Sequence, residues 1–501
     1  MPLIVTTLYG LAALFGAAFG LIELRMLRRF LRNRGVIRAS WASRPVMAGR
    51  DEASTASDLA MAPRVTIQLP LYNERTAADR IIRAAAGQEY PRDRFDVQVL
   101  DDSNDETTAI ATRVVDELRA EGVDIELIHR DHRTGYKAGA LAEGLQRTDA
   151  EFVAVFDADF APEPHFLRRL LVEERAFDDP GVAFVQARWA WGTEATRGWL
   201  PATLALLLDR HFRVQKPVRA FLGNVTTFNG SGGIWRRTAI DDAGGWTSDT
   251  LTEDLDLSYR CALAGWKGHY LPDVKVLNEL PGHMRAFKLQ QRRWAKGSAQ
   301  CLRKLMSRVM RAGDLVESRW DEAFMLAGYA IHPVLFLSLL LWPWAVLMMD
   351  RRLFWVMQGL MSLSIVAAAL SLVVTIRERD DRLGPSAIRE VVAGLCVGTG
   401  LMVNNTVGQL QGLFVRGGEF VRTPKLAAGH DDASLASLGA DRAYASPLHW
   451  TFFLEIAVMA YSVWSANLLV RAGEPLWSLA MVFWAVCMGL TIQQQVVART
   501  A

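Results

Sequence analysis

The sequence predicts an α/β domain with a mostly parallel sheet, inserted between helices that span a membrane. From residue 63 to about residue 160, short apolar strand patterns alternate with helical patterns, as in parallel strands joined by helical crossovers. Long apolar runs lie on both sides of this region. Carboxylates follow several of the predicted strands, where the ligand of such a sheet binds.

The apolar residues are concentrated near the two ends of the 501-residue chain, which is 51% hydrophobic. Residues 3–24 form a run long enough to cross a bilayer, and the blocks 323–376 and 449–495 are each long enough for two spans. No positive charge precedes the first run, which argues against a cleavable signal peptide. Arginines follow it, so the N-terminus is expected outside and the next residues in the cytoplasm. These arginines are Arg25, Arg28, Arg29, Arg32 and Arg34.

Charge and cysteine content exclude several classes of protein. The net charge of +2, without a basic domain, argues against a nucleic-acid partner, and the arginines after the first run are expected to face anionic membrane lipids. The cysteines have no pair spacing, so neither a disulfide framework nor a zinc site is predicted. They are Cys261, Cys301, Cys396 and Cys487.

The soluble domain is expected over residues 63–280, after a linker at 40–62 that is rich in Ala, Ser and Asp. Its predicted strands are RVTIQLPLYN, FDVQVLDDS, DIELIHR and EFVAVFDADF. The predicted helices between them are AADRIIRAAAGQ, ETTAIATRVVDELRAEG and KAGALAEGLQRT. The carboxyl ends of these strands therefore define the expected ligand edge.

Three acidic clusters and one aromatic, basic motif suggest transfer of a sugar from a nucleotide. A diphosphate donor needs a carboxylate-bound metal, and the attacking hydroxyl needs a separate carboxylate base. Asp157 and Asp159 alternate after an apolar strand, so their oxygens face one side and suit Mg²⁺ or Mn²⁺. The other clusters are Asp101 with Asp102 and Glu253 with Asp254, followed by QQRRW at 290–294.

Taken together, these motifs resemble the membrane-embedded family 2 glycosyltransferases. This branch contains the cellulose synthases and, closer to this chain, the cellulose-synthase-like glucomannan and mannan synthases. The strings that carry the resemblance span roughly residues 65–425 and are LPLYNE, LDDSND, GYKAGAL, DAD, FNGSGG, TEDLDLSYR, QQRRW and FVRTPK. The resemblance implies a GT-A-type domain and an inverting transfer that makes a β-linked product.

The resemblance also implies which residues bind the donor. It places Tyr72, Asn73 and Glu74 at the nucleotide, together with Asp101, Asp102 and Lys137, and it makes Asp157 and Asp159 the metal ligands. Each motif has a plainer alternative. LPLYNE is also typical of a polar turn, DD of a helix-capping loop, and a lysine such as this one of a solvated surface.

For the reaction itself, the resemblance makes Asp254 the general base, with Glu253 beside it. Direct displacement needs such a base opposite the leaving diphosphate. The acceptor end is assigned to Phe228, Asn229, Gly230 and Ser231. Cellulose synthases usually carry cysteine at the position of Asn229, which weakens cellulose as the product. A helix N-cap and a glycine-rich turn without a ligand are the respective alternatives.

Two further motifs are expected at the mouth of a channel. Gln290, Arg293 and Trp294 fit QxxRW on a helix, where tryptophan offers a flat face to a sugar ring and arginine binds a diphosphate. The same helix fits an amphipathic helix at the membrane surface. Thr423 and Lys425, in FVRTPK, match the gating loop of cellulose synthases, and a basic loop near the membrane is the alternative.

The expected topology places a transmembrane helix and basic segment at 1–39, interfacial helices at 281–322 and hairpins at 323–376 and 449–501. Residues 377–448 are expected to hold an interfacial helix and the gating-type loop. Residues 389–415 are only moderately apolar, and as a span they would place FVRTPK outside the cell. We therefore expect five spans.

The sequence favours an inner-membrane transferase that extends a β-linked polysaccharide processively from UDP-glucose or GDP-mannose. One alternative is a transferase that glycosylates a lipid such as ceramide or diacylglycerol. Another is an inactive relative that assists assembly or binds nucleotide. The sequence does not select the donor, the linkage or a secretion partner.

Overall fold

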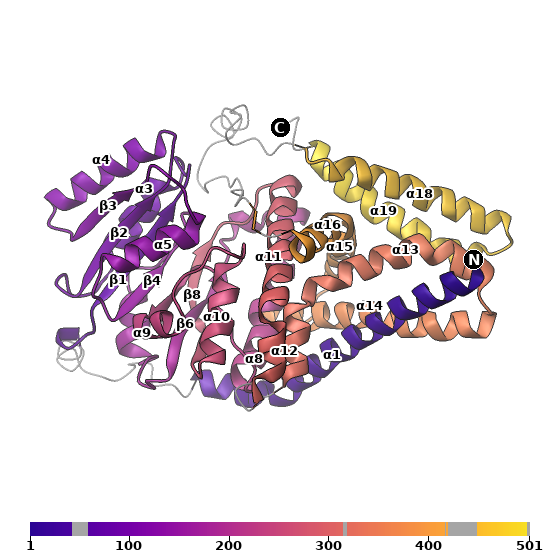
Figure 1. Cartoon of the computed structure of the whole chain (residues 1–501), viewed down its shortest axis with the longest axis horizontal. Coiled ribbons are helices and arrows are strands. Elements are labelled where there is room, and N and C mark those ends of the chain that lie inside the picture. Colours follow the sequence, from indigo (N-terminus) through magenta and orange to yellow (C-terminus); the bar gives the residue numbers. More distant parts are fainter. Residues whose placement is uncertain (43–58, 314–317, 416, 419–447, 498–501) are drawn as a thin grey trace.

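The computed structural model describes residues 1–42, 59–313, 318–415, 417–418 and 448–497. A sheet domain forms one end of the molecule and a bundle of long helices the other, with helix α11 (Met284–Arg311) between them (Figure 1). The N-terminal helix α1 (Pro2–Ala42) runs from the far end of the bundle to the junction with the sheet domain (Figure 1).

The first half of the sheet is parallel and follows the predicted alternation. Its strands are β1 (Val65–Leu71), β2 (Phe95–Asp101), β3 (Ile125–His129) and β4 (Phe152–Val155), in the spatial order β3-β2-β1-β4. Leu71 pairs with Asp101, so the segments that follow β1 and β2 leave the sheet at the same edge. The predicted strands are confirmed, and the edge at which we expect the ligand is the one where the loops after β1 and β2 leave the sheet.

The second half of the sheet mixes strand directions. Strands β7 (Gly233–Arg236), β6 (Val182–Ala190), β8 (Lys267–Asn278) and β5 (Phe160–Ala161) continue the order after β4. Strand β7 is antiparallel to both β4 and β6, whereas β6 and β8 are parallel. Because Val155 pairs with Gly233, the residues before β7 lie beside those after β4.

Helices cover both faces of the sheet. Buried residues of α3 (Ala78–Ala86) and α4 (Thr107–Ala120) pack on one face, with α6 (Phe166–Arg168) and the π-helix η1 (Arg169–Glu173). The other face packs against α5 (Tyr136–Gln146), α9 (Arg237–Asp242) and α10 (Glu253–Leu263). The result is a three-layer GT-A-type α/β domain, as predicted.

A nearly continuous helical rod joins the domain to the bundle. After the short 3₁₀ turn η2 (Glu194–Thr196), it consists of α7 (Trp199–Asp209), the π-helical segment η3 (Arg210–Gln215) and α8 (Lys216–Phe221). A π-helical turn inside an α-helix widens the backbone and is frequent at functional sites. Helix α12 (Arg319–Leu326) and the 3₁₀ turn η5 (Gly328–Ala330) lie on the same junction.

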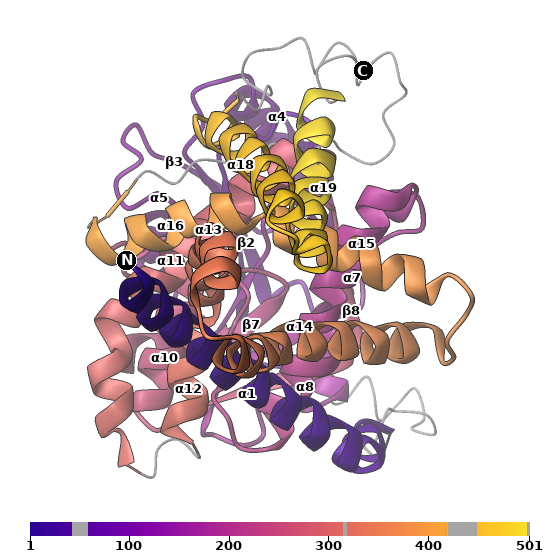
Figure 2. The ribbon, with the colours of Figure 1, turned by 90° about the vertical axis from the view of Figure 1, so that its right-hand side faces the viewer.

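Within the described part of the chain, five helices are long and apolar enough to cross a membrane. Their spans lie within α1, η5 with α13 (Ile331–Met348), α14 (Arg351–Asp380), α18 (Thr451–Arg471) and α19 (Pro475–Val497). Helices α15 (Ala387–Gly400) and α16 (Met402–Phe414) are bent by 45° at a short break and count as a sixth span if the pair is taken as one. Figure 2 views the bundle end-on, with α18 and α19 side by side.

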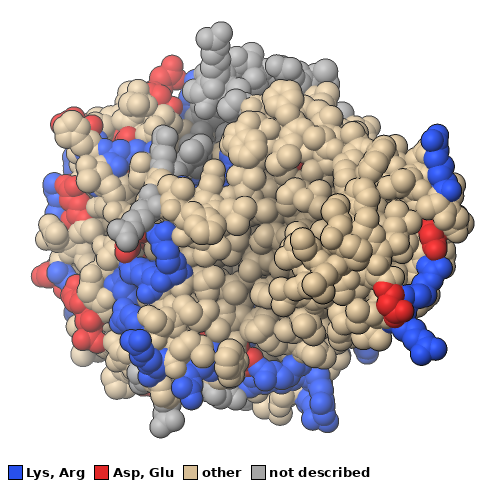
Figure 3. Space-filling view, turned by 45° about the vertical axis from the view of Figure 1, so that its right-hand side comes forward, with Lys and Arg blue, Asp and Glu red and all other residues tan. Residues whose placement is uncertain are grey.

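The surface reflects this division. Over the bundle the visible face carries almost no charged side chain except at its far end, whereas Lys and Arg gather beside the junction (Figure 3). The far end includes the exposed pair of Arg351 with Glu474. A surface without charges is what a hydrocarbon environment requires.

Candidate active site

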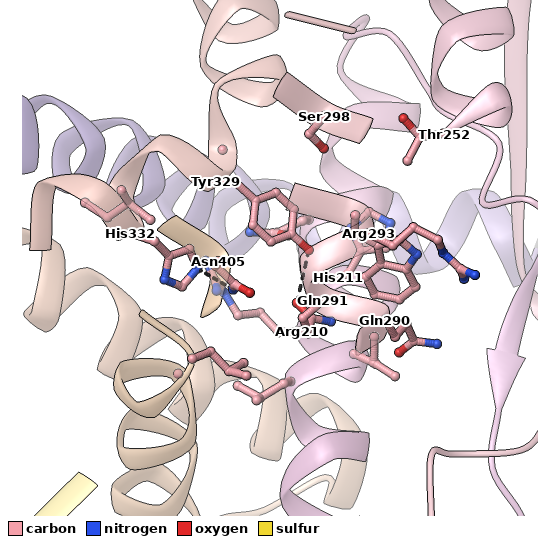
Figure 4. Close-up of a pocket in the computed structure, with 18 of the residues that line it drawn as sticks. Arg210, His211, Thr252, Gln290, Gln291, Arg293, Ser298, Tyr329, His332 and Asn405 are labelled. Carbon is pink, nitrogen blue, oxygen red and sulfur yellow. Dashed lines mark hydrogen bonds between the residues drawn. The ribbon is translucent and has the colours of Figure 1, made fainter. Parts of the chain in front are cut away.

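A cavity of about 750 Å³ lies where the carboxyl edge of the sheet meets the helical bundle. Its lining begins at Tyr72 and Asp102, passes Asp157 and Asp254, and continues between the bundle helices as far as Trp342. Figure 4 shows its middle part, where side chains from α11, η3 and the bundle face one another.

At the sheet end, two arginines organise the predicted nucleotide loops. The guanidinium of Arg133 lies 3.4 Å from the centre of the Tyr72 ring, and Arg130 donates two hydrogen bonds of 2.6 Å to Asp102. Asp101, by contrast, is fully buried and its carboxylate accepts from Thr108. Asp102 is therefore the member of the pair that reaches the cavity, and Asp101 supports its loop.

The loop after β1 is tied to the loop after β2. Asn73 has a positive φ of 55°, its backbone N–H donates to Ser103 Oγ, and its side chain donates to Asn104. Glu74 follows and lines the cavity. In this structure Asn73 acts on the neighbouring loop, while Tyr72 and Glu74 face the space that a ligand would fill.

The amine of Lys137 lies among several carboxylates of the site. It lies 2.5 Å from Asp157 Oδ1 and 3.7 Å from Glu253 Oε1, and it donates to the carbonyl of Gly230 at 2.8 Å. Burial lowers the pKa of Lys137, but the carboxylates of Asp157 and Glu253 outweigh burial and raise it overall. A lysine held charged among carboxylates is suited to meet a phosphate.

Asp157 and Asp159 both line the cavity, as their spacing predicted. The backbone N–H of Asp157 donates to Ser231 Oγ, which fixes the start of the DAD segment. Among the residues that the structure describes, no group of three or more His, Cys, Asp or Glu side chains is arranged to hold a metal. The two aspartates therefore fit a hard cation only if a ligand such as a diphosphate supplies further oxygens.

Asp254 lies in the first turn of α10, beside the glycine-rich segment before β7. A Cβ built on Gly230, whose φ is +80°, would stand 3.5 Å from Asp254 Oδ2. Burial raises the pKa of Asp254 to about 7, with the neighbouring Glu253 as the second cause. A carboxylate with such a pKa can accept a proton near neutral pH, which is the property of a general base.

The four residues expected at the acceptor end have different environments. Phe228 is nearly fully buried against Trp235, and Ser231 is fully buried below the DAD segment. Asn229 and Gly230 are only partly buried and line the cavity. The structure therefore brings Asn229 and Gly230 beside Asp254, while Ser231 supports the segment from behind.

Helix α11 forms one wall of the cavity. Gln290, Arg293 and Trp294 line it, and Figure 4 shows the labelled Gln290 and Arg293 on this wall. Burial lowers the pKa of Arg293, although Glu253, Asp157 and Asp254 oppose this effect. The helix packs closely on the segment that precedes Asp254, because a Cβ on Gly297 would lie 2.5 Å from Thr252 Cγ2.

A glutamine on α11 links the Asp254 segment to the end of the α16 region. Gln300 accepts from the backbone N–H of Leu251 at 2.9 Å and donates to the carbonyl of Gly417 at 2.8 Å. Thr423 and Lys425 of the FVRTPK motif lie outside the described residues. Gly417, which precedes this motif in the chain, is thus hydrogen-bonded to the helix that carries QxxRW.

Several residues of the site escaped the sequence reasoning. Arg133 lies two residues before the GYK segment and has no distinctive spacing, and Arg210, His211 and Gln215 line the cavity from the π-helical segment η3. The sequence does contain a signal for Glu23. A carboxylate at the end of an apolar run is energetically costly unless it has a partner, so a partner could have been expected. Glu23 pairs with Arg210 at 2.7 Å.

This combination of a three-layer sheet domain, paired aspartates after β4 and the partly buried Asp254 at the start of α10 is that of a glycosyltransferase-like domain. Residues 63–297 match the family described as Glycosyltransferase like family 2.

The chain is similar to plant proteins named as glucomannan 4-beta-mannosyltransferases. The chain is 43% identical over 253 residues to glucomannan 4-beta-mannosyltransferase 2 of Arabidopsis thaliana, covering 50% of this chain and 47% of the relative. It is 41% identical over 286 residues to a probable glucomannan 4-beta-mannosyltransferase 9 of Oryza sativa subsp. japonica, covering 56% and 53%. The chain thus spans about half the length of these relatives.

Among solved structures, the mannosyltransferase PcManGT of Pyrobaculum calidifontis, in complex with GDP-Man and Mn²⁺, aligns with a TM-score of 0.46. The identity is 19%, and the alignment covers 78% of this chain and 99% of that one.

Proposed function

We propose that this protein is a membrane-embedded inverting glycosyltransferase that adds hexose units to a β-linked polysaccharide. The observation that carries the proposal is the position of Asp254. It lies in one cavity with Asp157, Asp159 and the charged Lys137, and burial raises its pKa to about 7. A phosphate-binding group and a poised base thus face the same space.

The reaction follows from the division of roles among these side chains. Tyr72 and Asp102 hold the nucleotide at the sheet edge, while Lys137 and Arg293 neutralise the diphosphate. Asp254 accepts the proton of the attacking acceptor hydroxyl on the opposite side of the sugar. Displacement by this hydroxyl breaks the bond to the diphosphate and inverts the anomeric carbon, so an α-linked donor gives a β-linked product.

Asp157 and Asp159 are the residues that would hold a divalent cation, Mg²⁺ or Mn²⁺. Hard carboxylate oxygens suit these ions, and a donor diphosphate and water would complete the coordination. When bound, such an ion neutralises charge on the departing diphosphate. Lys137, 2.5 Å from Asp157, would then exchange this carboxylate for a phosphate oxygen.

The shape of the cavity supports polymer extension. Beyond Trp294 it continues between the bundle helices, past the partly buried Tyr329 and His332 to Trp342. A growing glycan could remain in this space while the next donor binds, and could leave across the inner membrane. GDP-mannose is the favoured donor because the named relatives are glucomannan 4-beta-mannosyltransferases, with UDP-glucose as the second donor.

Glycosylation of a lipid such as ceramide or diacylglycerol is a second candidate, and one observation favours it. A shallow apolar groove beside α15 and α19 is lined by Trp199, Ile388 and Val392, which suits an acyl chain. The groove is separate from the cavity that contains Asp254, so polymer extension remains preferred. An inactive assembly partner is disfavoured, because Asp157, Asp159 and Asp254 all line one cavity.

Incubation with labelled donors tests the proposal. Membranes containing the full-length protein are incubated with radiolabelled GDP-mannose or UDP-glucose, and the products are extracted with chloroform and sized. A long, water-phase polymer from either donor is the expected result. A chloroform-soluble product would instead support lipid glycosylation, and no incorporation from either donor would contradict transferase activity with them.

A further inference from the structure

A buried lysine stands directly behind the acceptor end of the cavity. Lys216, the first residue of α8, is 2% exposed, and its amine donates to the carbonyl of Thr227 at 2.5 Å and to Asn229 Oδ1. Both of these acceptors are uncharged. The rings of Phe212 and Tyr270 lie within 6 Å of the same amine. Burial lowers the pKa of Lys216 well below its ordinary value.

The contacts of Lys216 determine how the amide of Asn229 is turned. A lysine side chain donates to both carbonyl oxygens in either of its protonation states, so Asn229 must direct its oxygen toward the lysine. The amide nitrogen then faces His211, whose Nε2 lies 3.2 Å away. The backbone of Asn229 is held independently, because its N–H donates to the buried Gln186 at 2.8 Å.

The same geometry selects one tautomer of His211. Nε2 accepts from the amide of Asn229, so the proton of the neutral ring resides on Nδ1. Burial lowers the pKa of His211 to about 3, so the ring is neutral at physiological pH. Gln215, four residues along the π-helical segment, is hydrogen-bonded to His211 and donates in turn to Glu23 of α1.

These groups face the cavity and carry no net charge. His211, Gln215 and Asn229 line it, and Glu23 is neutralised by Arg210. Figure 4 labels His211 and Arg210 among the side chains that line the cavity. A neutral surface with donors and acceptors of fixed orientation suits the hydroxyl groups of an uncharged sugar unit.

We propose that His211 and Asn229 bind hydroxyl groups of the acceptor glycan, and that Lys216 is a positioning residue that fixes their orientation. This inference rests on the proposed function and adds to it a specificity-determining pair. An acceptor held beside Gly230 presents its hydroxyl to Asp254, because that glycine lies next to the carboxylate. Loss of the orientation would weaken acceptor binding and leave the nucleotide end, at Tyr72 and Asp102, unchanged.

Calorimetric titration of the full-length protein in detergent tests the inference. Mannohexaose and cellohexaose are the acceptor probes, and GDP and UDP report on the nucleotide end. His211→Phe and Lys216→Met are each expected to weaken binding of the hexaose that the wild type prefers by about 10-fold. His211→Gln, which keeps a donor and an acceptor, should restore most of the affinity. Lys267→Met, at a lysine whose side chain is 74% exposed, is the matched control for a lost amine.

The double variant His211→Phe with Lys216→Met distinguishes a lost orientation of the acceptor-binding side chains from a general disturbance of the structure. If Lys216 acts by orienting Asn229 and His211, its loss already disturbs the contact that His211→Phe removes, so the two effects do not add, whereas independent structural effects would add. Unchanged hexaose affinity in the single variants, additive effects, or no hexaose binding by the wild type would overturn the inference. If Lys216→Met also loses nucleotide affinity through misfolding, the hexaose affinities of His211→Gln and His211→Phe are compared instead. Equal affinities of these two variants would then overturn the inference.

The proposed function is tested separately, by measuring sugar transfer. A wild-type protein that binds a hexaose but incorporates no sugar from either donor contradicts the transferase, while the variant affinities still decide the role of His211 and Lys216.

Discussion

The ammonium of Lys137 lies 2.5 Å from Asp157 Oδ1, on one of the two carboxylates that we propose as ligands of a divalent ion. The lysine and a metal would therefore compete for Asp157 until a diphosphate is present to receive the lysine. This competition makes metal binding and donor binding depend on each other.

Replacement of Lys137 by Met is expected to affect the two ligands in opposite directions. Removal of the competing cation should strengthen Mn²⁺ binding in the absence of nucleotide, as measured by electron paramagnetic resonance. Loss of a charged phosphate partner should weaken GDP or UDP binding by about 10- to 100-fold. Asp149→Asn, at an exposed carboxylate, is the control for a general change of charge. A parallel loss of both affinities would contradict competition at Asp157.

Asp254→Asn is expected to abolish transfer while nucleotide binding survives. Asparagine keeps the shape of the side chain but accepts no proton, and loss of a general base typically slows a reaction by about 100- to 10,000-fold. The measurements are the rate of sugar incorporation and the calorimetric affinity for nucleotide. Asp241→Asn, at an exposed aspartate of α9, is the matched control. Turnover close to that of the wild type would exclude Asp254 as the base.

The pH dependence of the reaction follows from the same residue. Burial raises the pKa of Asp254 to about 7, so the carboxylate is protonated and inactive below that pH and ionised above it. The value of kcat/KM should therefore fall by about tenfold per pH unit below pH 7 and level off above it, since this quantity reports the free enzyme. A profile that is flat between pH 5.5 and pH 8 would not fit this assignment.

A buried ion pair between α11 and α18 is expected to contribute to stability. The amine of Lys288 contacts Glu455 and donates to Gln495 at 2.9 Å, and both charged groups are buried. Lys288→Met or Glu455→Leu alone leaves one buried charge without its partner and should cost about 3–5 kcal/mol.

The double variant of this pair should recover much of that loss, because no isolated charge remains. Thermal unfolding of the four proteins in detergent measures the coupling. Additive destabilisation in the double variant would show that the pair does not act as a unit.

The sequence predicted the fold best where its periodicity was local. Strands β1 to β4 and helices α3 to α5 each carry a clear apolar pattern between polar turns, and all of them are present. Strands β6 and β8 were not predicted, because their positions depend on long-range pairing and on the antiparallel strand β7. Residues 387–414 form a bent pair of helices. Their length and composition do not decide whether the pair crosses the membrane once or not at all.

For the site, short motifs located Asp157, Asp254 and Trp294, and the structure brings them to one cavity. The sequence could not reveal that Asp101 and Ser231 lie below the surface of the cavity. It also could not reveal His211, which lines the cavity from the π-helical segment between α7 and α8. Such a segment depends on the surrounding packing more than on a local residue pattern.

The anomeric configuration of the product tests the central claim most directly. Purified full-length protein, GDP-α-mannose or UDP-α-glucose and the matching hexaose are incubated with Mn²⁺, and the new linkage is identified by proton NMR before and after digestion with a β-specific glycosidase. A single displacement assisted by Asp254 gives only β-linked product, which the glycosidase removes. An α-linked product that resists the glycosidase would contradict the account.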